Sequence, residues 1–488
     1  MPANFIPSGV EYFRVLPEII LVVIATLIMV LEPLTPQRRK PLLGYLAFFG
    51  IAAAILPAAL AARLQGTAFG GMVIIDGFAV YFRVLVLAVS MLIVLISAGY
   101  LRREGAESGE YYSLLLYSTA GQCMMAAANE LIVVFIGLEI SSIASYILAG
   151  YLRREKLGNE ASAKYFLLGS FATAFLLYGI ALIYGTAGTT SLSELHNILS
   201  SRQAAPSGIL VGTAAALMFV GFAFKVSAAP FQVWAPDVYQ GAPAPVTAFL
   251  AAGPKAAAFA VFIRVFMTAF GATSGAWAPV VWMSALLTMI VGNFAALAQH
   301  NVKRLLAYSS IAHAGYVMVA VAAHSEIGTA AAMFYLAAYV FMNVGAFAIV
   351  SYFSRKGERF VRIEDFAGLG RRRPMIAAMF TIFLLSFIGV PLTGGFFAKF
   401  YVFKAALDAN LVWLTVLGLL NSAVAAFYYL RLLVVMYMQE PGESTKDLPP
   451  LPWGTKAAMW ASAALTLLLG IFPSVVLNFA DRYAALVK

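Results

Sequence analysis

The sequence predicts an all-α polytopic membrane protein, and three observations lead to that fold class. Of the 488 residues, 62% are hydrophobic and 11% are charged, and the mean hydropathy is +0.88; soluble domains run nearer about 45–50% apolar and about 25% charged. The apolar residues gather in stretches of about 20, the length that a helix needs to cross a bilayer. The basic residues cluster in alternate loops between these stretches. The outer surface is therefore expected to face hydrocarbon.

About fourteen stretches are candidate membrane spans, and they cover the chain from end to end. They lie near residues 15–34, 41–62, 78–101, 111–128, 131–152, 161–187, 208–228, 243–271, 276–298, 302–322, 327–353, 375–405, 409–437 and 456–477. The first run is long enough to remain as a span, so no cleavable signal is expected. We divide the chain into three N-terminal spans (1–110), two five-span units (111–271 and 276–437) and a last span (438–488).

Basic residues predict the orientation of the chain. Clusters follow the first, third, fifth, ninth and eleventh spans, namely Arg38, Arg39 and Lys40; Arg102 and Arg103; Arg153, Arg154 and Lys156; Lys303 and Arg304; and Arg355, Lys356, Arg359, Arg362, Arg371, Arg372 and Arg373. The loops after the even-numbered spans hold only Arg63 and Arg202. Because positive loops stay in the cytoplasm, both termini are expected on the periplasmic side of a bacterial inner membrane. The net charge of +10 is thus a topology signal and not a nucleic-acid footprint.

Several kinds of chemistry are not expected on this chain. The single cysteine, Cys123, can form neither an intramolecular disulfide nor a multi-cysteine iron–sulfur or zinc site. Neither the glycine-rich dinucleotide fingerprint nor the phosphate-binding loop occurs. Any redox or nucleotide chemistry linked to this protein is therefore expected on a partner.

Ionisable side chains inside the spans are the strongest functional signal. A charge at a helix centre costs about 2.5–3.5 kcal/mol on insertion scales, whereas charges near span ends can reach the interface without any function. The second group comprises Glu18, Glu32, Arg83, Lys164, Lys404 and Arg431. Among these, the function of Lys164 stays open.

Five central residues remain as candidates: Glu139, Lys225, Lys255, His313 and Lys399. Glu139 and Lys225 could form a purely structural ion pair, and His313 could be a hydrogen-bonded packing residue. Lys255 and Lys399 lack an equally central carboxylate. Desolvation lowers the proton affinity of a lysine and a nearby carboxylate raises it, so a lysine whose partner moves is a proton switch. These five central residues therefore predict that the protein moves protons.

Two spans are predicted to break at membrane depth. Pro230 and Pro236 interrupt the seventh span, and Pro391, Gly394 and Gly395 interrupt the twelfth. The breaks lie five spans apart, and each has a lysine within about two turns. Interrupted helices in corresponding positions indicate an inverted-repeat transporter, here with spans 4 to 8 and 9 to 13 as repeats. Two ordinary proline kinks are the alternative.

The chain resembles the antiporter-like membrane subunits of respiratory complex I, the proton-translocating NADH–quinone oxidoreductase, and within them subunit N. The resemblance covers essentially the whole length. The segments that match the family are residues 135–139, 225–243, 253–255, 303–316 and 391–399. The run Asp-Val-Tyr-Gln-Gly-Ala-Pro at 237–243 is particularly like subunit N, whereas Lys-Arg-Leu-Leu-Ala-Tyr-Ser-Ser at 303–310 is shared with multisubunit cation/proton antiporters.

The resemblance assigns a role to most of the candidates. It implies that Glu139 pairs with Lys225, that Lys255 passes protons along the axis, and that Lys399 lies near the exit half-channel. His313 matches a family histidine. Lysine at position 399 disfavours subunit M, whose members carry glutamate there, and the lack of a long lateral helix after the last span disfavours subunit L.

The resemblance also implies partners and an external source of energy. NADH, FMN, iron–sulfur clusters and quinone would be bound by partner subunits, with no cofactor or metal on this chain. The expected neighbours are subunit M, the small K- and J-type subunits, and the lipid bilayer. Three alternatives remain: a subunit of a cation/proton antiporter or membrane-bound hydrogenase, a non-transporting scaffold, and an independent solute carrier, for which no dedicated pocket is evident in the sequence.

Overall fold

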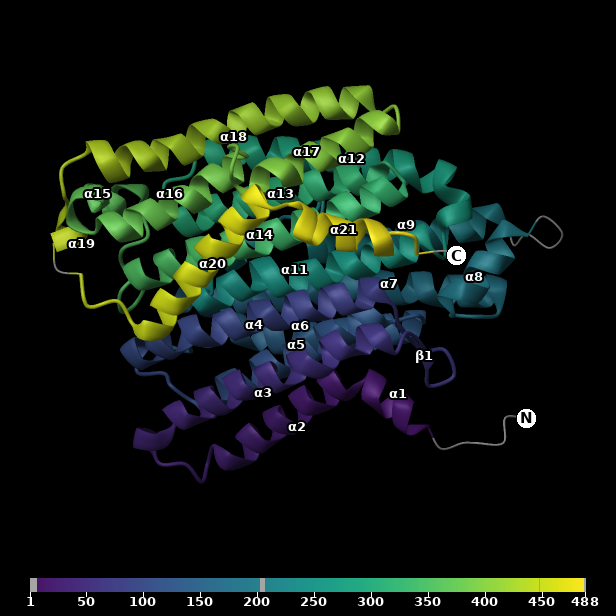
Figure 1. Ribbon diagram of the computed structural model, residues 1–488, viewed down its shortest axis with the longest axis horizontal. Coiled ribbons are helices and arrows are strands. Elements are labelled where there is room, and N and C mark those ends of the chain that lie inside the picture. Colours follow the sequence, from purple (N-terminus) through teal and green to yellow (C-terminus); the bar gives the residue numbers. More distant parts are fainter. Residues whose placement is uncertain (1–6, 202–206, 447, 487–488) are drawn as a thin grey trace.

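The computed structural model describes residues 7–201, 207–446 and 448–486, so Arg202 lies outside the described residues. Long helices run side by side in one bundle (Figure 1). The N-terminal group comprises α1 (Gly9–Arg14), α2 (Leu16–Leu31), α3 (Pro41–Leu60) and α4 (Gly77–Glu104), with a two-stranded antiparallel hairpin of β1 (Gly66–Ala68) and β2 (Val73–Ile75). Next come α5 (Gly109–Ala127), α6 (Leu131–Ala149), α7 (Lys156–Ala187), α8 (Leu192–Ser200), α9 (Gly208–Val226), α10 (Trp234–Gly241) and α11 (Ala244–Met267).

The second half of the chain continues the bundle. It contains α12 (Ser274–Leu297), α13 (Val302–Ala322), α14 (Glu326–Phe353), α15 (Leu369–Arg372), α16 (Pro374–Ile388), α17 (Gly394–Asp408), α18 (Val412–Met438), α19 (Glu443–Lys446), α20 (Trp453–Ile471) and α21 (Ser474–Tyr483). Short 3-10 turns lie at Gln37–Arg39, Ala61–Arg63, Gly271–Thr273 and Ile363–Phe366. The helices α11, α13 and α14 are the most completely buried of the long apolar helices, so side chains on them lie near the centre of the bundle.

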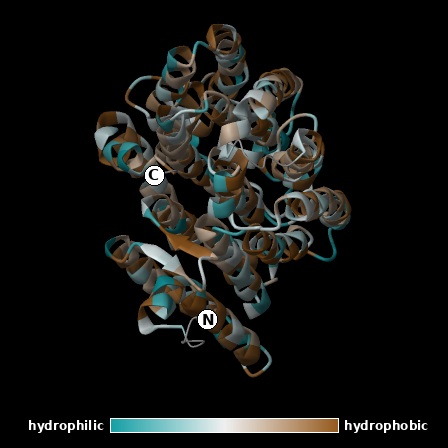
Figure 2. Ribbon diagram, turned by 90° about the vertical axis from the view of Figure 1, so that its right-hand side faces the viewer, coloured by the Kyte–Doolittle hydropathy of each residue, from teal (hydrophilic) through white to brown (hydrophobic). Residues whose placement is uncertain are grey.

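The helices have the length and surface of membrane spans. Within the described residues, eleven helical segments are long and apolar enough to cross a bilayer, and Leu16–Leu31 and Pro374–Ile388 are shorter apolar helices. Large apolar side chains such as Trp413, Phe171 and Phe427 point outward. Figure 2, which looks along the helices, shows apolar residues on the outside of the bundle as well as inside. The chain is therefore an all-α multi-pass membrane protein.

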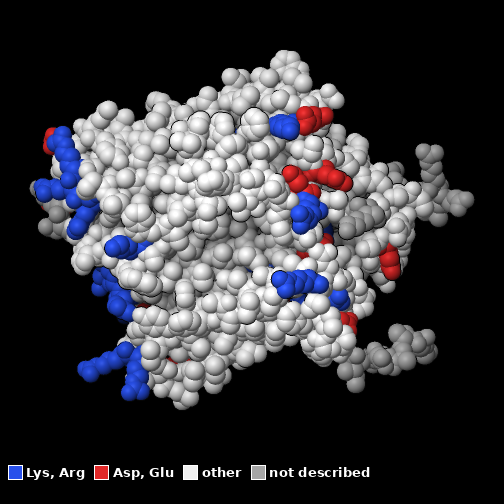
Figure 3. Space-filling view, in the orientation of Figure 1, with Lys and Arg blue, Asp and Glu red and all other residues white. Residues whose placement is uncertain are grey.

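Charge is distributed unevenly between the two ends of the bundle. Lys and Arg gather at the left-hand end, where α15 and α19 lie, with few acidic residues beside them (Figures 1 and 3). The first and last helices, α1 and α21, lie toward the opposite end (Figure 1). The basic loops and these two terminal helices thus lie toward opposite ends of the spanning helices.

The interruption expected in the seventh span separates α9 from α10. α9 ends at Val226, Ser227 adopts a left-handed conformation with φ of 63°, and Pro230 lies in the gap before Trp234 begins α10. Pro236 is different, because it lies in the first turn of α10. Proline is tolerated there, since the first N–H groups of a helix have no intrahelical partner. The interpretation of Pro236 as a break was therefore wrong.

The second interruption separates α16 from α17. α16 ends at Ile388, Gly389 has φ of 92°, and Pro391 lies in the gap. Gly394 and Gly395 are not in the gap but are the first two residues of α17. Their role is to allow close approach: a Cβ on Gly395 would lie 1.8 Å from the carbonyl oxygen of Ser386 on α16.

The last expected span, 456–477, was wrong at its C-terminal end. α20 stops at Ile471, Pro473 precedes a new helix, and the ten-residue α21 packs back against α14 and α4. Hydropathy alone predicted a continuous span across this break because Phe472, Val475 and Val476 are apolar.

Glu32 is buried rather than turned toward the interface, which corrects the expectation for this residue. It accepts hydrogen bonds from Lys40 Nζ (2.5 Å), Ser108 Oγ (2.9 Å) and Gly109 N at the start of α5 (2.6 Å). Burial opposes ionisation, but these hydrogen bonds from Lys40, Gly109 and Ser108 outweigh it and hold the pKa of Glu32 below its ordinary value. The carboxylate thus fastens the α2–α3 loop to the N-terminus of α5.

We expect Glu32→Gln to lower the free energy of unfolding by about 1–3 kcal/mol at pH 7, because the hydrogen bonds to a buried carboxylate are lost. A lowered pKa in the folded state stabilises the protein above the unfolded-state pKa of about 4.3, and this contribution disappears as the pH falls further. Thermal unfolding of the purified protein should show a difference between wild type and variant that is at its full size well above a pH of about 4.3 and shrinks as the pH falls below that value. The exposed neighbour Glu110 supplies the control, since Glu110→Gln should change little.

Candidate functional site

Lys255 lies at the centre of the bundle on α11 and is 2% exposed. Its Nζ donates to the backbone oxygen (3.1 Å) and the Oγ (2.5 Å) of Ser310 on α13. Within the described residues, no carboxylate lies within ion-pair distance of it. Lys255 is thus a buried amine whose hydrogen-bond partners are neutral oxygens and not a counterion.

His313 lies one turn farther along α13 than Ser310 and is buried. Its Nδ1 is 2.6 Å from the hydroxyl of Tyr335, and its Nε2 is 3.4 Å from the hydroxyl of Tyr429. Tyr429 also contacts the hydroxyl of Ser309. Hydroxyls therefore meet both nitrogens of the ring, an arrangement compatible with proton relay and equally with a hydrogen-bonded packing residue.

Lys399 reaches from α17 into the break between α16 and α17. Its Nζ donates to the backbone oxygens of Phe387 (3.0 Å) and Ile388 (2.8 Å) and to Ser422 Oγ (2.7 Å), and it lies 4.9 Å from the ring centre of Tyr316. The two carbonyls are orphan acceptors because α16 ends there, and the helix dipole adds partial negative charge. The interrupted helix thus supplies a cation site at membrane depth.

Lys225 lies in the last turn of α9, beside the first break. Its Nζ donates to Ser142 Oγ (2.7 Å) and to Tyr146 OH (3.0 Å), both on α6. Glu139 instead accepts a hydrogen bond from Thr173 Oγ1 on α7 (2.9 Å). Among the described residues Glu139 makes no ion pair, so its expected pairing with Lys225 is wrong for this state: Glu139 turns toward α7, and hydroxyls occupy the donors of Lys225.

A small cavity of about 20 Å³ separates Lys225 from the central helix α11. Ser141, Ser142 and Ser145 line one side, and Pro254, which precedes Lys255, lines the other. A polar cavity of this size holds one water molecule. A single water would therefore fit between the first lysine and the turn of α11 that carries the second.

Two buried arginines, unlike the three lysines, have carboxylate partners among the described residues. Arg83, expected to reach the interface, is buried and lies 2.7 Å from Glu18. Arg264 donates to both carboxylate oxygens of Asp76 (2.8 and 2.9 Å). The position of Arg264 inside an expected span was a signal that sequence reasoning missed. Both arginines are compensated charges, so they read as structural pairs.

Lys164 belongs to a network that fixes α10. Its Nζ lies 2.7 Å from Asp237 and 2.6 Å from Glu160, and Arg304 on α13 binds the other oxygen of Asp237 at 2.7 Å. Asp237 thus joins α7, α10 and α13. Lys303, expected among the loop cations, is completely buried and paired with Glu358 from the loop after α14. No sequence signal pointed to Glu358, because its partner lies 55 residues away.

Comparison with known proteins gives consistent matches. A family model described as NADH:quinone oxidoreductase/Mrp antiporter, TM, matches residues 128–425. The chain is 60% identical to NADH-quinone oxidoreductase subunit N 1 of Solibacter usitatus over 488 residues, covering all of both chains. It is 44% identical to NADH-quinone oxidoreductase subunit N of Trichlorobacter lovleyi over 473 residues, 97% of each chain.

Solved structures share the fold over nearly the whole length. A chain of respiratory complex I from Thermus thermophilus with bound aureothin is 36% identical, with a TM-score of 0.82, and the match covers 95% of this chain and 99% of that one. A chain of the Mrp complex from a Dietzia species has a TM-score of 0.85 at 22% identity, over 97% of both chains. The second likeness concerns the fold alone.

Proposed function

Because the chain belongs to the family of NADH-quinone oxidoreductase N subunits, the antiporter-like membrane subunits of complex I, we propose that it carries protons along its central axis. The groups proposed to hold the proton in turn are Glu139, Lys225, Lys255, His313 and Lys399. As one subunit of an oxidoreductase complex, the chain would draw its driving energy from quinone reduction elsewhere. The proposal places NADH, FMN, iron–sulfur clusters and quinone on partner subunits.

The observation that carries this proposal is the environment of the lysines. Lys225, Lys255 and Lys399 are each held by hydroxyl or carbonyl oxygens, and within the part of the chain that the structure describes none of them forms an ion pair with a carboxylate. A structural lysine inside a membrane would be expected to have a counterion, as Arg83 and Arg264 have. Neutral oxygens accept from an ammonium group, and hydroxyls can also donate to the neutral amine, so these sites suit both protonation states.

The proposed path joins these groups in the order of the fold. The cavity beside Lys225 leads toward Lys255, Ser310 connects Lys255 to α13, and one turn farther lies His313. Tyr429, which contacts His313, stacks on the ring of Phe387, whose carbonyl binds Lys399. Short proton transfers between neighbouring groups, with water in the cavity, would complete the route.

We further propose fourteen spans, with units 111–271 and 276–437 as inverted repeats. The support is a matched set of helix contacts. In the first unit α5 packs on α6 and α11, α7 on α6, α9 and α10, and α9 on α11. In the second unit α12 packs on α13 and α18, α14 on α13, α16 and α17, and α16 on α18. Each of these contacts in the first unit has its counterpart five spans later in the second.

The orientation and partners follow from charge and family. The basic end of the bundle is proposed to face the cytoplasm of a bacterial cell and both termini the periplasm. Subunit M and the small K- and J-type subunits are the proposed neighbours. Identity to N subunits over whole chains favours this assignment over a cation/proton antiporter, since the matching chain of the Mrp complex, at 22% identity, shows the fold alone.

The decisive experiment is Lys225→Ala in the intact complex, reconstituted in vesicles. We expect quinone reduction per complex to continue while the number of protons pumped per electron falls, because this subunit no longer transfers its share. Lys156→Ala, at an exposed lysine on α7, is the matched control. Native gels establish assembly. An unchanged proton-to-electron ratio in the assembled Lys225 variant would favour a scaffold without transport.

A further inference from the structure

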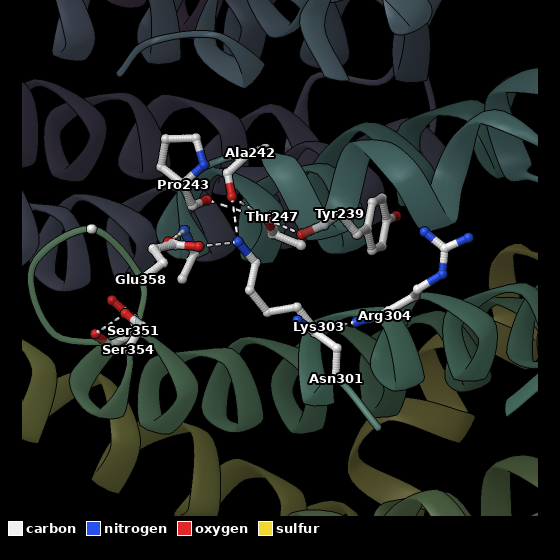
Figure 4. A network of polar contacts seen from close by, with 12 residues as sticks. Tyr239, Ala242, Pro243, Thr247, Asn301, Lys303, Arg304, Ser351, Ser354 and Glu358 are labelled. Atoms are coloured by element: carbon white, nitrogen blue, oxygen red, sulfur yellow. Dashed lines mark hydrogen bonds and ion pairs between the residues drawn. The ribbon is translucent and has the colours of Figure 1, made fainter. Parts of the chain in front are cut away.

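The loop after α14 holds a strained backbone against the bundle. Arg355, Gly357 and Glu358 have φ of 49°, 72° and 49°. Left-handed conformations are uncommon for residues with a side chain and persist where the surroundings hold them in place. At Glu358 the surroundings are visible: its carboxylate points inward from the loop to the helices (Figure 4).

The carboxylate of Glu358 joins three helices. Oε1 accepts from Tyr100 OH on α4 and from the backbone N–H of Ala244 at the start of α11, both at 2.8 Å. Oε2 binds the Nζ of Lys303 on α13. These helices are far apart in the sequence, so a single loop side chain fixes their relative positions at this end of the bundle.

Lys303 complements this arrangement. Its Nζ also donates to the backbone oxygen of Ala242 (2.5 Å), directly after α10 ends (Figure 4). The pair therefore spans the short connection from α10 to α11. The cation lies on the carbonyl end of α10 and the anion on the amide end of α11, so both charges match the helix dipoles. Reversing either charge would oppose them.

The connection that this pair fixes leads to the proposed proton path. α10 runs back to the break beside Lys225, and α11 carries Lys255. Lys303 and Ser310 are seven residues apart on α13 and therefore lie on the same face. Ser310 supplies the contacts of Lys255. A shift at the Lys303–Glu358 pair would thus move both α11, which carries the donor Lys255, and α13, which carries the acceptor Ser310.

We propose that Glu358 is a positioning residue for proton transfer, acting through Lys303 and the α10–α11 connection. The inference rests on the proposed function and adds a loop residue to it. Positioning errors of about 1 Å are enough to slow a reaction by about 100-fold. Loss of the carboxylate should therefore lower pumping while leaving the quinone-reducing subunits untouched.

The test is Glu358→Gln in the complete complex, with protons pumped per electron measured beside quinone reduction. We expect proton transfer through this subunit to slow by about tenfold or more, with quinone reduction per assembled complex retained. A merely structural role would reduce the amount of complex and not this ratio. Glu358→Asp, which keeps the charge, should restore part of the ratio. Glu364→Gln, in the same loop at an exposed residue 3.7 Å from His300, should pump as wild type.

A double variant keeps the test decisive if Lys303 without its counterion prevents assembly. Lys303→Gln/Glu358→Gln replaces the ion pair by a neutral hydrogen-bonding pair. A ratio of protons to electrons below the wild-type value in the assembled double variant supports action through the Lys303–Glu358 pair. A wild-type ratio in the assembled Glu358→Gln or double variant overturns the inference. Lys255→Met is measured in parallel: if it also pumps normally the proposed function fails, and if it does not, only the role of Glu358 fails.

Discussion

Replacing Lys255 by methionine is expected to slow proton transfer through this subunit by about 100-fold or more, the contribution of a positioned proton-transfer group. Lys255 is buried, and among the described residues its amine donates hydrogen bonds to the two oxygens of Ser310. Methionine fills a similar volume without the amine, and volume-conserving changes usually cost less than about 1.5 kcal/mol. The complex should therefore assemble with its quinone-reducing activity, while fewer protons are pumped per electron.

The Lys255 experiment has a control at an exposed lysine of another helix. Lys404 lies on α17 but is exposed, so Lys404→Ala should leave the ratio of protons to electrons unchanged. Native gels and quinone reduction give the amount of intact complex in each preparation. A Lys255→Met complex that assembles and pumps with the wild-type ratio would remove Lys255 from the path and, with it, the central link of the proposed function.

Hydropathy located the helices well because a bilayer imposes length and composition on each span. Hydropathy did not predict the helix ends, which depend on local backbone geometry. Pro236 reads as a helix breaker in sequence, yet its place in the first turn of α10 makes it harmless. Pro473 ends the last long helix although the flanking residues are apolar. Whether a proline breaks a helix depends on its position within the helix, which composition does not encode.

The candidate site shows a similar division. Lys255, His313 and Lys399 could be singled out as candidates from sequence, because an ionisable residue at a span centre is unusual whatever its neighbours are. Their partners were not predictable, since they are hydroxyls and backbone carbonyls from distant helices. Glu358 was missed for the same reason: nothing in a charged loop distinguishes the one carboxylate that folds inward onto Lys303.

Gly395→Ala is expected to cause the largest loss of stability, at least about 3 kcal/mol, the upper part of the usual cost of overpacking. The added Cβ would lie 1.8 Å from the backbone oxygen of Ser386 and 2.7 Å from its carbonyl carbon. No rotamer can relieve a clash with backbone, so α16 and α17 must separate. The measurement is the yield of intact complex on native gels together with its thermal unfolding midpoint.

The separation forced by Gly395→Ala would also reach Lys399. That side chain binds the carbonyls of Phe387 and Ile388, which directly follow Ser386, so any complex that survives should pump fewer protons per electron. Gly185 on α7 is the control, because a Cβ there meets no atom within 4 Å and alanine favours a helix by up to about 1 kcal/mol. A Gly395→Ala complex as stable as the Gly185→Ala complex would contradict the close packing of the two half-helices, and the geometry of the Lys399 site would have to be revised with it.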